Sequence, residues 1–272
     1  MNWGRIKTIL IILFLFTDIF LAFSIFTSRQ KETEISPEVL SATAKILEEH
    51  GILIDKSAIP SKISHASVLQ ADNVISDYSE FAHLLLGDGF SEEDKNTFIA
   101  KDMHLSFQGD KFRFENLSAP DISENFTLNE AQKSAFSYLK GLGFDVSSAK
   151  VVSSDSYGGL FRIKIRDYAE NMPIYSSETD ISISKNGVHS LLGSWFNRRV
   201  NNNPDNKLKS PASILVDFAS TYEGADSQIK STELGYSVLD SATYHKSASL
   251  IPVTKIQLVS GTEYFIDSRQ IE

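Results

Sequence analysis

Hydrophobic residues follow one another almost without interruption near the start of the chain. From Ile9 to Phe26, fourteen of the eighteen residues are Leu, Ile or Phe, and only three are polar: Thr17, Asp18 and Ser24. As a helix, this run is about 27 Å long, close to the thickness of a hydrocarbon core. Its apolar residues favour insertion by about 4 to 8 kcal/mol, whereas one aspartate costs about 2.5–3.5 kcal/mol. The pattern therefore predicts a membrane-spanning helix.

The charges around this run favour a cytoplasmic N-terminus. Arg5 and Lys7 precede the run, whereas the basic residues after it, Arg29 and Lys31, are offset by neighbouring glutamates. Residues 22–24 match a small-x-small cleavage site, but the apolar run is longer than the 7–15 residues usual for a signal peptide. We expect an uncleaved single-pass anchor in the cell membrane, with the rest of the chain extracellular.

Helix start signals recur beyond the anchor. Ser36 and Ser210 each precede a proline, as is typical of an N-cap and a first helical position. Thr127-Leu-Asn-Glu130 is a capping box, and Ser91-Glu-Glu-Asp94 resembles another. The expected helices cover residues 37–50, 80–86, a short stretch that begins at 91, 128–142 and 211–222.

Alternating apolar and polar positions predict antiparallel strands between these helices. The strongest turn signal is Lys185-Asn-Gly-Val188, because Asn-Gly supplies the positive φ angles of a type I′ turn. The expected strands are 52–54, a hairpin over 103–114, 149–154, 159–168, 173–184, a return strand from 188 to about 196, 233–245, 251–259 and 263–267.

Residues 127–197 and 210–268 share one plan, a helix followed by antiparallel strands. This pattern predicts an α+β fold in which helices pack on antiparallel sheets. We expect two similar helix-plus-strands subdomains, preceded by a smaller N-terminal part. The predicted divisions are a cytoplasmic tail (1–5), the transmembrane anchor (6–28), a linker (29–36), an N-terminal extracellular part (37–120), a middle subdomain (121–200) and a C-terminal subdomain (201–272).

Composition excludes several classes of partner and site. The net charge is 26 − 35 = −9, which argues against nucleic acid and against anionic membrane surfaces as partners. The chain has no cysteine, so it forms no disulfide and has no cysteine-based metal site.

Motifs for catalysis are incomplete. Ser-x-x-Lys occurs at Ser137, Ser147 and Ser182, but the chain has neither the Lys-Thr-Gly nor the Ser-Asp-Asn motif that accompanies it in penicillin-recognising enzymes. The six histidines include no HExxH motif, and no glycine-rich phosphate loop is present. We expect no catalytic, cofactor or metal site, and therefore no enzyme.

Asp18 is the residue that most needs an explanation. A carboxylate within a membrane is costly unless it meets a donor, so it indicates a contact with another transmembrane helix. It can also be a tolerated polar residue that draws in water. The small side chain of Ala22 permits close approach of a second helix, from the same protein or another. Residues on the same helical face as Asp18 are Ile11, Phe14, Leu15, Leu21, Ala22 and Ile25.

Three segments resemble the YycI (WalI) family of Gram-positive bacteria. The first covers the N-terminus, with Met1-Asn-Trp3, Arg5, Lys7-Thr-Ile9 and Asp18-Ile-Phe-Leu21. Met172-Pro-Ile-Tyr175 resembles a strand opening of the external domain, from which Met172 itself departs. Glu263-Tyr-Phe-Ile-Asp267 resembles the closing strand.

This resemblance implies a membrane accessory protein that is not an enzyme. Members of the family associate with the sensor histidine kinase of the YycFG (WalRK) cell-wall system and with the sister protein YycH. A polar residue occupies the place of Asp18 in the family. The resemblance therefore implies that the anchor and the extracellular domain adjust kinase activity.

Two other functional classes stay open. The extracellular part can be a tethered module that binds cell-wall polymer or peptide. The chain can instead be a secreted inhibitor of an extracellular protease, released between Ser24 and Ile25. A hydrolase is a more remote alternative.

Overall fold

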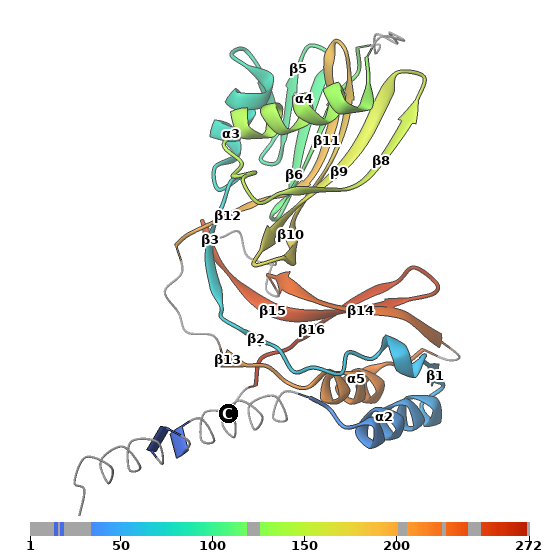
Figure 1. Cartoon of the computed structure of the whole chain (residues 1–272). Coiled ribbons are helices and arrows are strands. Elements are labelled where there is room, and N and C mark those ends of the chain that lie inside the picture. Colours follow the sequence, from blue (N-terminus) through green and yellow to red (C-terminus); the bar gives the residue numbers. More distant parts are fainter. Residues whose placement is uncertain are drawn as a thin grey trace, which may run out of the picture.

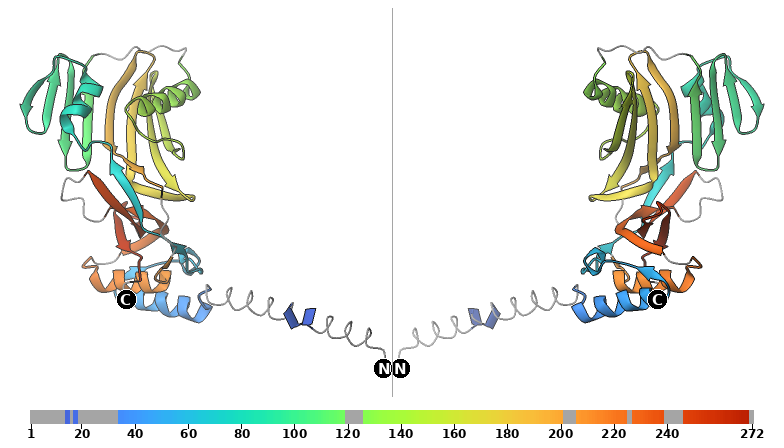
Figure 2. Two further views of the ribbon diagram at one scale, coloured as in Figure 1. Left: turned by 90° about the vertical axis from the view of Figure 1, so that its left-hand side faces the viewer. Right: turned by 90° about the vertical axis from the view of Figure 1, so that its right-hand side faces the viewer.

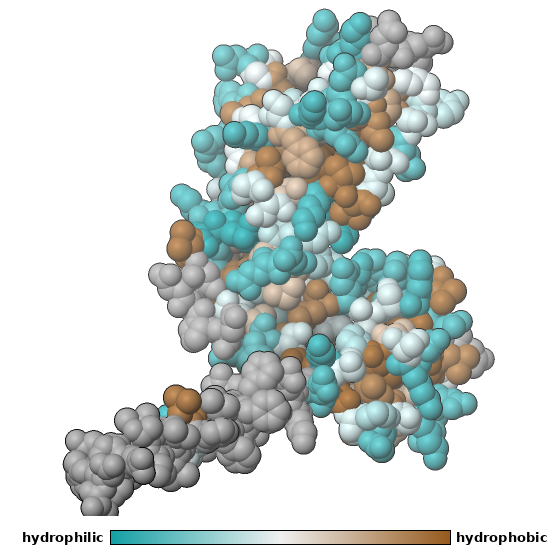
Figure 3. Space-filling view, in the orientation of Figure 1, coloured by the Kyte–Doolittle hydropathy of each residue, from teal (hydrophilic) through white to brown (hydrophobic). Residues whose placement is uncertain are grey.

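The computed structural model describes residues 14–15, 17–18, 34–118, 126–200, 206–224, 227–238 and 246–270. Figure 1 shows two lobes, one above the other, each with helices packed on strands. In the described part of the chain, hydrogen bonds link fourteen strands into one continuous sheet that runs through both lobes. The predicted α+β class is confirmed. On one side, an indentation separates the lobes (Figure 3).

The upper lobe contains an antiparallel sheet with both of its helices on one face. The strand order is β8-β9-β10-β11-β7-β6-β5-β4. Phe81 of α3 and Leu139 of α4 belong to one buried cluster with the sheet residues Phe112 and Ile163. The bounds are α3 (Tyr78–Leu86), β4 (Ser91–Asp94), β5 (Thr97–Ala100), β6 (Met103–Gln108), β7 (Lys111–Asn116), α4 (Leu128–Gly141), β8 (Lys150–Tyr157), β9 (Leu160–Ala169), β10 (Met172–Ser184) and β11 (Gly187–Ser194).

The lower lobe packs two helices against a second part of the sheet. Both helices lie at the end far from the upper lobe (Figure 2). Leu47 of α2 and Phe218 of α5 share a buried cluster with Ile52 and Ile256. The bounds are α2 (Pro37–Glu49), β1 (Ile52–Leu53), the 3-10 helix η1 (Lys56–Ala58), β2 (His65–Ala66), β3 (Leu69–Asn73), β13 (Asn206–Lys207), α5 (Pro211–Thr221), β14 (Ser227–Ser237), β15 (Ser247–Leu258) and β16 (Glu263–Asp267).

The three strongest helix start signals are confirmed. The Thr127 amide donates to Glu130 Oε2 at 2.9 Å, and the Glu130 amide donates to Thr127 Oγ1 at 3.4 Å, which completes the capping box of α4. Ser36 and Ser210 are the N-caps of α2 and α5, and each is followed by a proline. These side chains satisfy amides at the start of each helix that have no partner within the helix.

Segments distant in the sequence form the two lobes together. In the lower lobe, β1 pairs with β14 and β3 pairs with β15. In the upper lobe, β7 pairs with β11. The predicted N-terminal part, 37–120, therefore supplies strands to both lobes.

The lobes meet where β10 crosses onto β14. Ile174 pairs with Tyr236, and both residues are buried in a third cluster that also contains Phe196. Strand β12 (Phe196–Arg198) continues from the upper lobe and pairs with β3 of the lower lobe. The junction thus has an apolar core of its own.

One helix prediction is wrong. Ser91–Asp94 forms β4, an edge strand that pairs with β5, and does not open a helix. All four residues are exposed, and no apolar helical stripe follows them. The three acids suit a sheet edge, because charge on an edge strand disfavours pairing with other chains.

The turn at residues 185–188 is a hairpin, but not of the predicted type. Ser184 pairs with Gly187, so Lys185 and Asn186 are the two loop residues. Gly187 has a φ of 123°, whereas Asn186 is not among the described residues with a positive φ. The prediction of a type I′ turn is therefore wrong.

Two positive φ angles in succession occur instead between β9 and β10. Glu170 and Asn171 have φ angles of 51° and 69°, and they connect the paired residues Ala169 and Met172. This is the pattern of a type I′ hairpin.

Several sequence predictions fall outside the described residues. They are most of the predicted transmembrane anchor (6–28), most of the linker at 29–36 and the second half of the strand predicted over 233–245.

Candidate functional site

The predicted membrane contact is described only in part. Phe14, Leu15 and Asp18 are helical and exposed, with 60% and 59% of the Phe14 and Leu15 surfaces accessible. Among the described residues, no helix has both the length and the hydrophobicity needed to cross a membrane. The other predicted contacts lie outside the described residues: Ile11, Leu21, Ala22 and Ile25.

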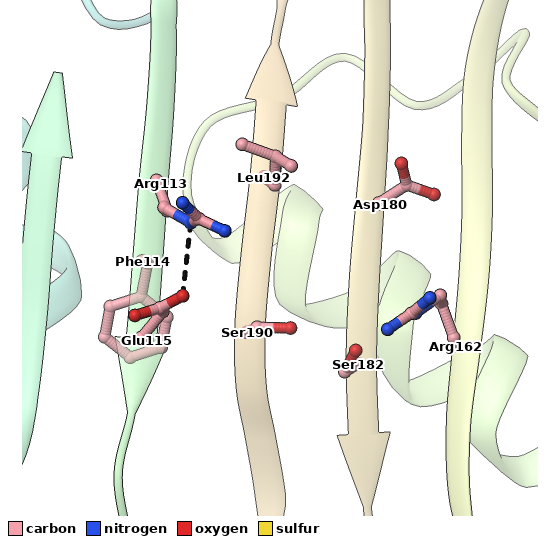
Figure 4. A pocket seen from close by; sticks show the side chains of 8 residues that line it. All are labelled: Arg113, Phe114, Glu115, Arg162, Asp180, Ser182, Ser190 and Leu192. Carbon is pink, nitrogen blue, oxygen red and sulfur yellow. Dashed lines mark ion pairs between the residues drawn. The ribbon is translucent and has the colours of Figure 1, made fainter. Parts of the chain in front are cut away.

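A polar face of the upper sheet carries two surface hollows. It lies opposite α3 and α4, as Figure 4 shows with α4 behind the strands. In β9 the side chains alternate, so that Ile163 and Ile165 are buried in the helix-covered core while Arg162, Lys164 and Arg166 lie on the other side. We call this surface the open face. Its main residues are Arg113, Glu115, Arg162, Lys164, Arg166, Glu178, Asp180, Ser182, Ser190 and Leu192.

A hollow of about 300 Å³ lies on the open face. The side chains of Arg113 and Arg162 point toward each other across β11 and β10, with Ser190 and Ser182 between them (Figure 4). The register places these two serines in one row, because Ser182 pairs with both Ser190 and Arg162. The small serine side chains leave the space that the longer arginines border.

A second hollow of about 340 Å³ continues toward the edge strand β8. Arg162 and Ser182 line both hollows. The second hollow adds the apolar surfaces of Tyr157 and Leu160 and the carboxylate of Asp155. The two hollows together cross β7, β11, β10, β9 and β8.

Ion pairs neutralise most charges of the open face. Arg113 Nε lies 3.1 Å from Glu115 Oε1. Lys164 Nζ lies 2.9 Å from an oxygen of Glu178 and 3.5 Å from an oxygen of Asp180.

The guanidinium of Arg166 also pairs with Glu178, with an Nε–Oε2 distance of 2.6 Å. Arg162 differs from its neighbours, because its side chain makes no ion pair or hydrogen bond within the described part of the chain, although its backbone belongs to the ladders with β8 and β10.

A polar network connects the open face to the lower lobe through Tyr175. The Tyr175 hydroxyl lies 2.9 Å from Glu233 Oε2, and the ring centroid lies 5.2 Å from Arg166 Cζ and 5.0 Å from Lys255 Nζ. The Phe265 ring packs against Tyr175 with centroids 5.1 Å apart. Burial, and then the Glu233 carboxylate, raise the pKa of Tyr175 far above its ordinary value, so the hydroxyl keeps its proton.

A buried carboxylate lies near the same junction. Asp167 is 2% exposed and accepts a hydrogen bond of 3.0 Å from Arg198 Nε. Burial raises the pKa of Asp167, although the positive charge of Arg198 opposes this effect. The Asp145 carboxylate raises it slightly further. Asp167 connects β9 to β12, the strand that enters the lower lobe.

One serine–histidine contact resembles part of a catalytic arrangement. Ser184 Oγ lies 2.8 Å from His189 Nε2, but Ser184 is only 2% exposed. The Asn186 amide donates a hydrogen bond to Ser184 Oγ at 3.3 Å, so this hydroxyl stabilises the hairpin turn. Within the described residues, no group of histidines and acids has the arrangement of a metal site.

The sequence analysis did not identify the open face. The signal was present in β9, where basic residues at 162, 164 and 166 alternate with isoleucines. Such alternation shows that a strand has one polar face, but it does not show which residues from other strands lie beside it. That information depends on the register with β10 and β11.

Comparisons with known proteins give only distant similarities. No family model matches the sequence, and no curated protein matches it. An uncharacterized protein from Eubacterium rectale has a similar structure, with a TM-score of 0.46 and 12% identity over 81% of this chain and 89% of that one.

Two further solved structures come from Bacillus species. YycH from Bacillus subtilis has a TM-score of 0.46 and 13% identity, over 80% of this chain but only 59% of YycH. The C-terminal domain of YpeB from Bacillus megaterium has a TM-score of 0.32 and 12% identity, over 88% of this chain and 95% of that domain. Similarities of this size carry no conclusion about activity or partners.

Proposed function

We propose that this protein is a membrane-anchored accessory regulator of a two-component sensor histidine kinase that controls cell-wall homeostasis. It acts through contacts of its transmembrane helix and of its extracellular lobes with the kinase (YycG/WalK-like) and with a YycH-like protein. The observation that carries the proposal is the single acid, Asp18, within the apolar run 9–26.

The energetics of Asp18 favour a helix partner. An unpaired carboxylate at mid-membrane costs about 2.5–3.5 kcal/mol, and a hydrogen-bond donor on another helix recovers part of that cost. Interhelical polar contacts contribute about 0.6–2 kcal/mol. If the contact forms in only one state of the kinase, this energy changes the active fraction several-fold.

The arrangement of the extracellular part supports the proposal in a second way. The two other segments that resemble the YycI family, 172–175 and 263–267, begin β10 and form β16. They meet at the Tyr175–Phe265 ring contact, beside the junction of the lobes. The segments that carry the resemblance thus belong to one structural unit.

The test compares association and signalling for variants of the anchor. In native membranes, Asp18→Leu should reduce co-purification of the kinase several-fold and shift the output of its target genes. Asp18→Asn keeps a polar group and should retain part of the association. Ser24→Leu is the matched control, because it removes a polar residue from another face of the helix. Unchanged association and output for Asp18→Leu would contradict the proposal.

A helix exchange separates this function from that of a tethered binding module. Replacement of residues 6–26 by an unrelated transmembrane helix keeps the extracellular part at the membrane. The regulator proposal predicts loss of kinase association in this variant. If the protein is only a tethered binding module, the helix-exchange variant should keep its full activity.

A further inference from the structure

We propose that the two hollows of the open face bind an extended acidic peptide segment of another protein, with one carboxylate held between Arg162 and Arg113. This inference concerns the upper lobe alone and does not depend on the role of the anchor.

Arg162 is the first reason. Six arginines lie in the described part of the chain, and Arg162 is the one without an ion pair. Each of the other five arginines forms an ion pair: Arg113–Glu115, Arg166–Glu178, Arg198–Asp167, Arg199–Asp72 and Arg269–Asp267. Arg162 is also one of the two residues, with Ser182, that line both hollows.

The geometry around Arg162 suits a carboxylate. The Arg113 and Arg162 side chains extend inward from β7 and β9 over the two strands that carry Ser190 and Ser182 (Figure 4), and the register places Glu115, the ion-pair partner of Arg113, beside Ser190. A guanidinium presents a planar fork of donors that matches the two oxygens of a carboxylate. The serine hydroxyls add donors at the floor of the hollow.

The ion pairs leave Arg162 as the guanidinium of the site that no carboxylate neutralises. Arg113 pairs with Glu115, and Lys164 pairs with Glu178 and Asp180. Asp155 lies opposite Arg162 in the register of β8 and β9, but the two side chains form no ion pair within the described residues. A ligand carboxylate can therefore pair with Arg162.

The length of the site favours a peptide over a small acid. The two hollows cross five neighbouring strands, β7 to β8, which corresponds to about 19 Å at about 4.8 Å per strand spacing. An extended peptide of about six residues has this length. Tyr157 and Leu160 offer apolar contact for a side chain next to the acid.

Fluorescence anisotropy with the full chain in detergent micelles tests this inference. The probes are labelled hexapeptides with one central glutamate and valine, leucine or tyrosine beside it, each with a glutamine-matched partner. The best glutamate peptide should bind at least about tenfold more tightly than its glutamine partner, a difference of about 1.4 kcal/mol.

Substitutions of Arg162 test whether this residue causes the preference for glutamate over glutamine peptides. Arg162→Gln should abolish the difference between the glutamate and glutamine peptides. Lys140→Gln makes the same change of charge on α4, on the other side of the sheet, and should keep that difference. Arg162→Glu should reverse the preference in favour of lysine peptides, a gain that a misfolded variant cannot show.

Four results would overturn the inference. They are equal binding of glutamate and glutamine peptides, a preference that survives Arg162→Gln, competition by N-acetylglutamate amide as strong as that of the peptide, and no binding at about 1 mM peptide. The third result would assign the site to a small acid. None of them bears on kinase association through Asp18, so the two proposals fail separately.

Discussion

The hydroxyl of Tyr175 donates a hydrogen bond to Glu233 Oε2 at 2.9 Å, between β10 and β14. Arg166 and Lys255 lie near the same ring, one from each lobe. Tyr175 thus joins charged residues of both lobes around one aromatic side chain, beside the apolar cluster of the junction. These contacts join the two lobes in addition to the strand pairings β10–β14 and β12–β3.

Removal of the Tyr175 hydroxyl should weaken the junction measurably. Tyr175→Phe keeps the ring and its contacts but loses the hydrogen bond to Glu233. We expect the free energy of unfolding to fall by about 1 kcal/mol. Urea unfolding followed by tryptophan fluorescence measures this change. Tyr157→Phe is the matched control, because Tyr157 is 88% exposed and should tolerate the loss of its hydroxyl. Equal stability of the two variants would show that the hydrogen bond contributes nothing.

Gly235 permits the close approach of β10 and β14. A Cβ atom at this position would lie 2.5 Å from the Pro173 carbonyl oxygen and 2.6 Å from Tyr175 Cε2. Gly235→Ala should therefore lower the free energy of unfolding by about 1–3 kcal/mol, because the backbone must shift.

Gly141→Ala is the control for this substitution. A Cβ atom at Gly141, in α4, meets no atom within 4 Å. We expect this variant to gain about 0.5–1 kcal/mol, since alanine favours a helix more than glycine does. A Gly235→Ala variant as stable as the parent chain would contradict the close crossing of the strands.

The pH dependence of stability should reveal the buried Asp167 carboxylate. Its pKa in the folded chain lies above the ordinary value of 3.8, mainly because of burial. The folded state therefore binds this proton more tightly than the unfolded state, and its contribution to stability falls as pH rises through the interval between the two pKa values.

Comparison of the parent chain with Asp167→Asn isolates this contribution. The free energy of unfolding of the parent, relative to the variant, should decrease from about pH 4 upward and become constant above the folded pKa. Urea unfolding at several pH values measures the difference. A relative stability that increases with pH would show that the attraction of Arg198 outweighs the cost of burial.

Local features of the fold were predictable from the sequence. The capping box at Thr127, the N-caps at Ser36 and Ser210, and the hairpin over 103–114 depend on residues within one turn or one strand pair. The helix prediction at Ser91 was wrong, because residues 91–94 resemble a capping box but no apolar helical stripe follows them. Asn-Gly at 186–187 predicted the correct hairpin but not its loop residues, since the strand register places the two-residue loop one position earlier in the chain, at Lys185 and Asn186.

The distribution of strands between the lobes could not be predicted. Ile52 pairs with Ser227, and Leu69 pairs with Leu250, across more than half of the chain. Nothing in either segment specifies a partner at that distance, because any half-buried strand presents the same backbone groups. The open face escaped prediction for the same reason: Arg113, Ser190, Ser182 and Arg162 become neighbours only through the order β7-β11-β10-β9.

Site-specific photocrosslinking from position 18 tests the central proposal most directly. A photoreactive amino acid replaces Asp18 in the full chain, and a second variant carries it at Ser24 as a control on another helical face. The proposal predicts a covalent adduct between position 18 and the transmembrane region of a sensor histidine kinase, with little or none from position 24. Absence of a kinase adduct from position 18, or a mature chain that begins after residue 26, would contradict it.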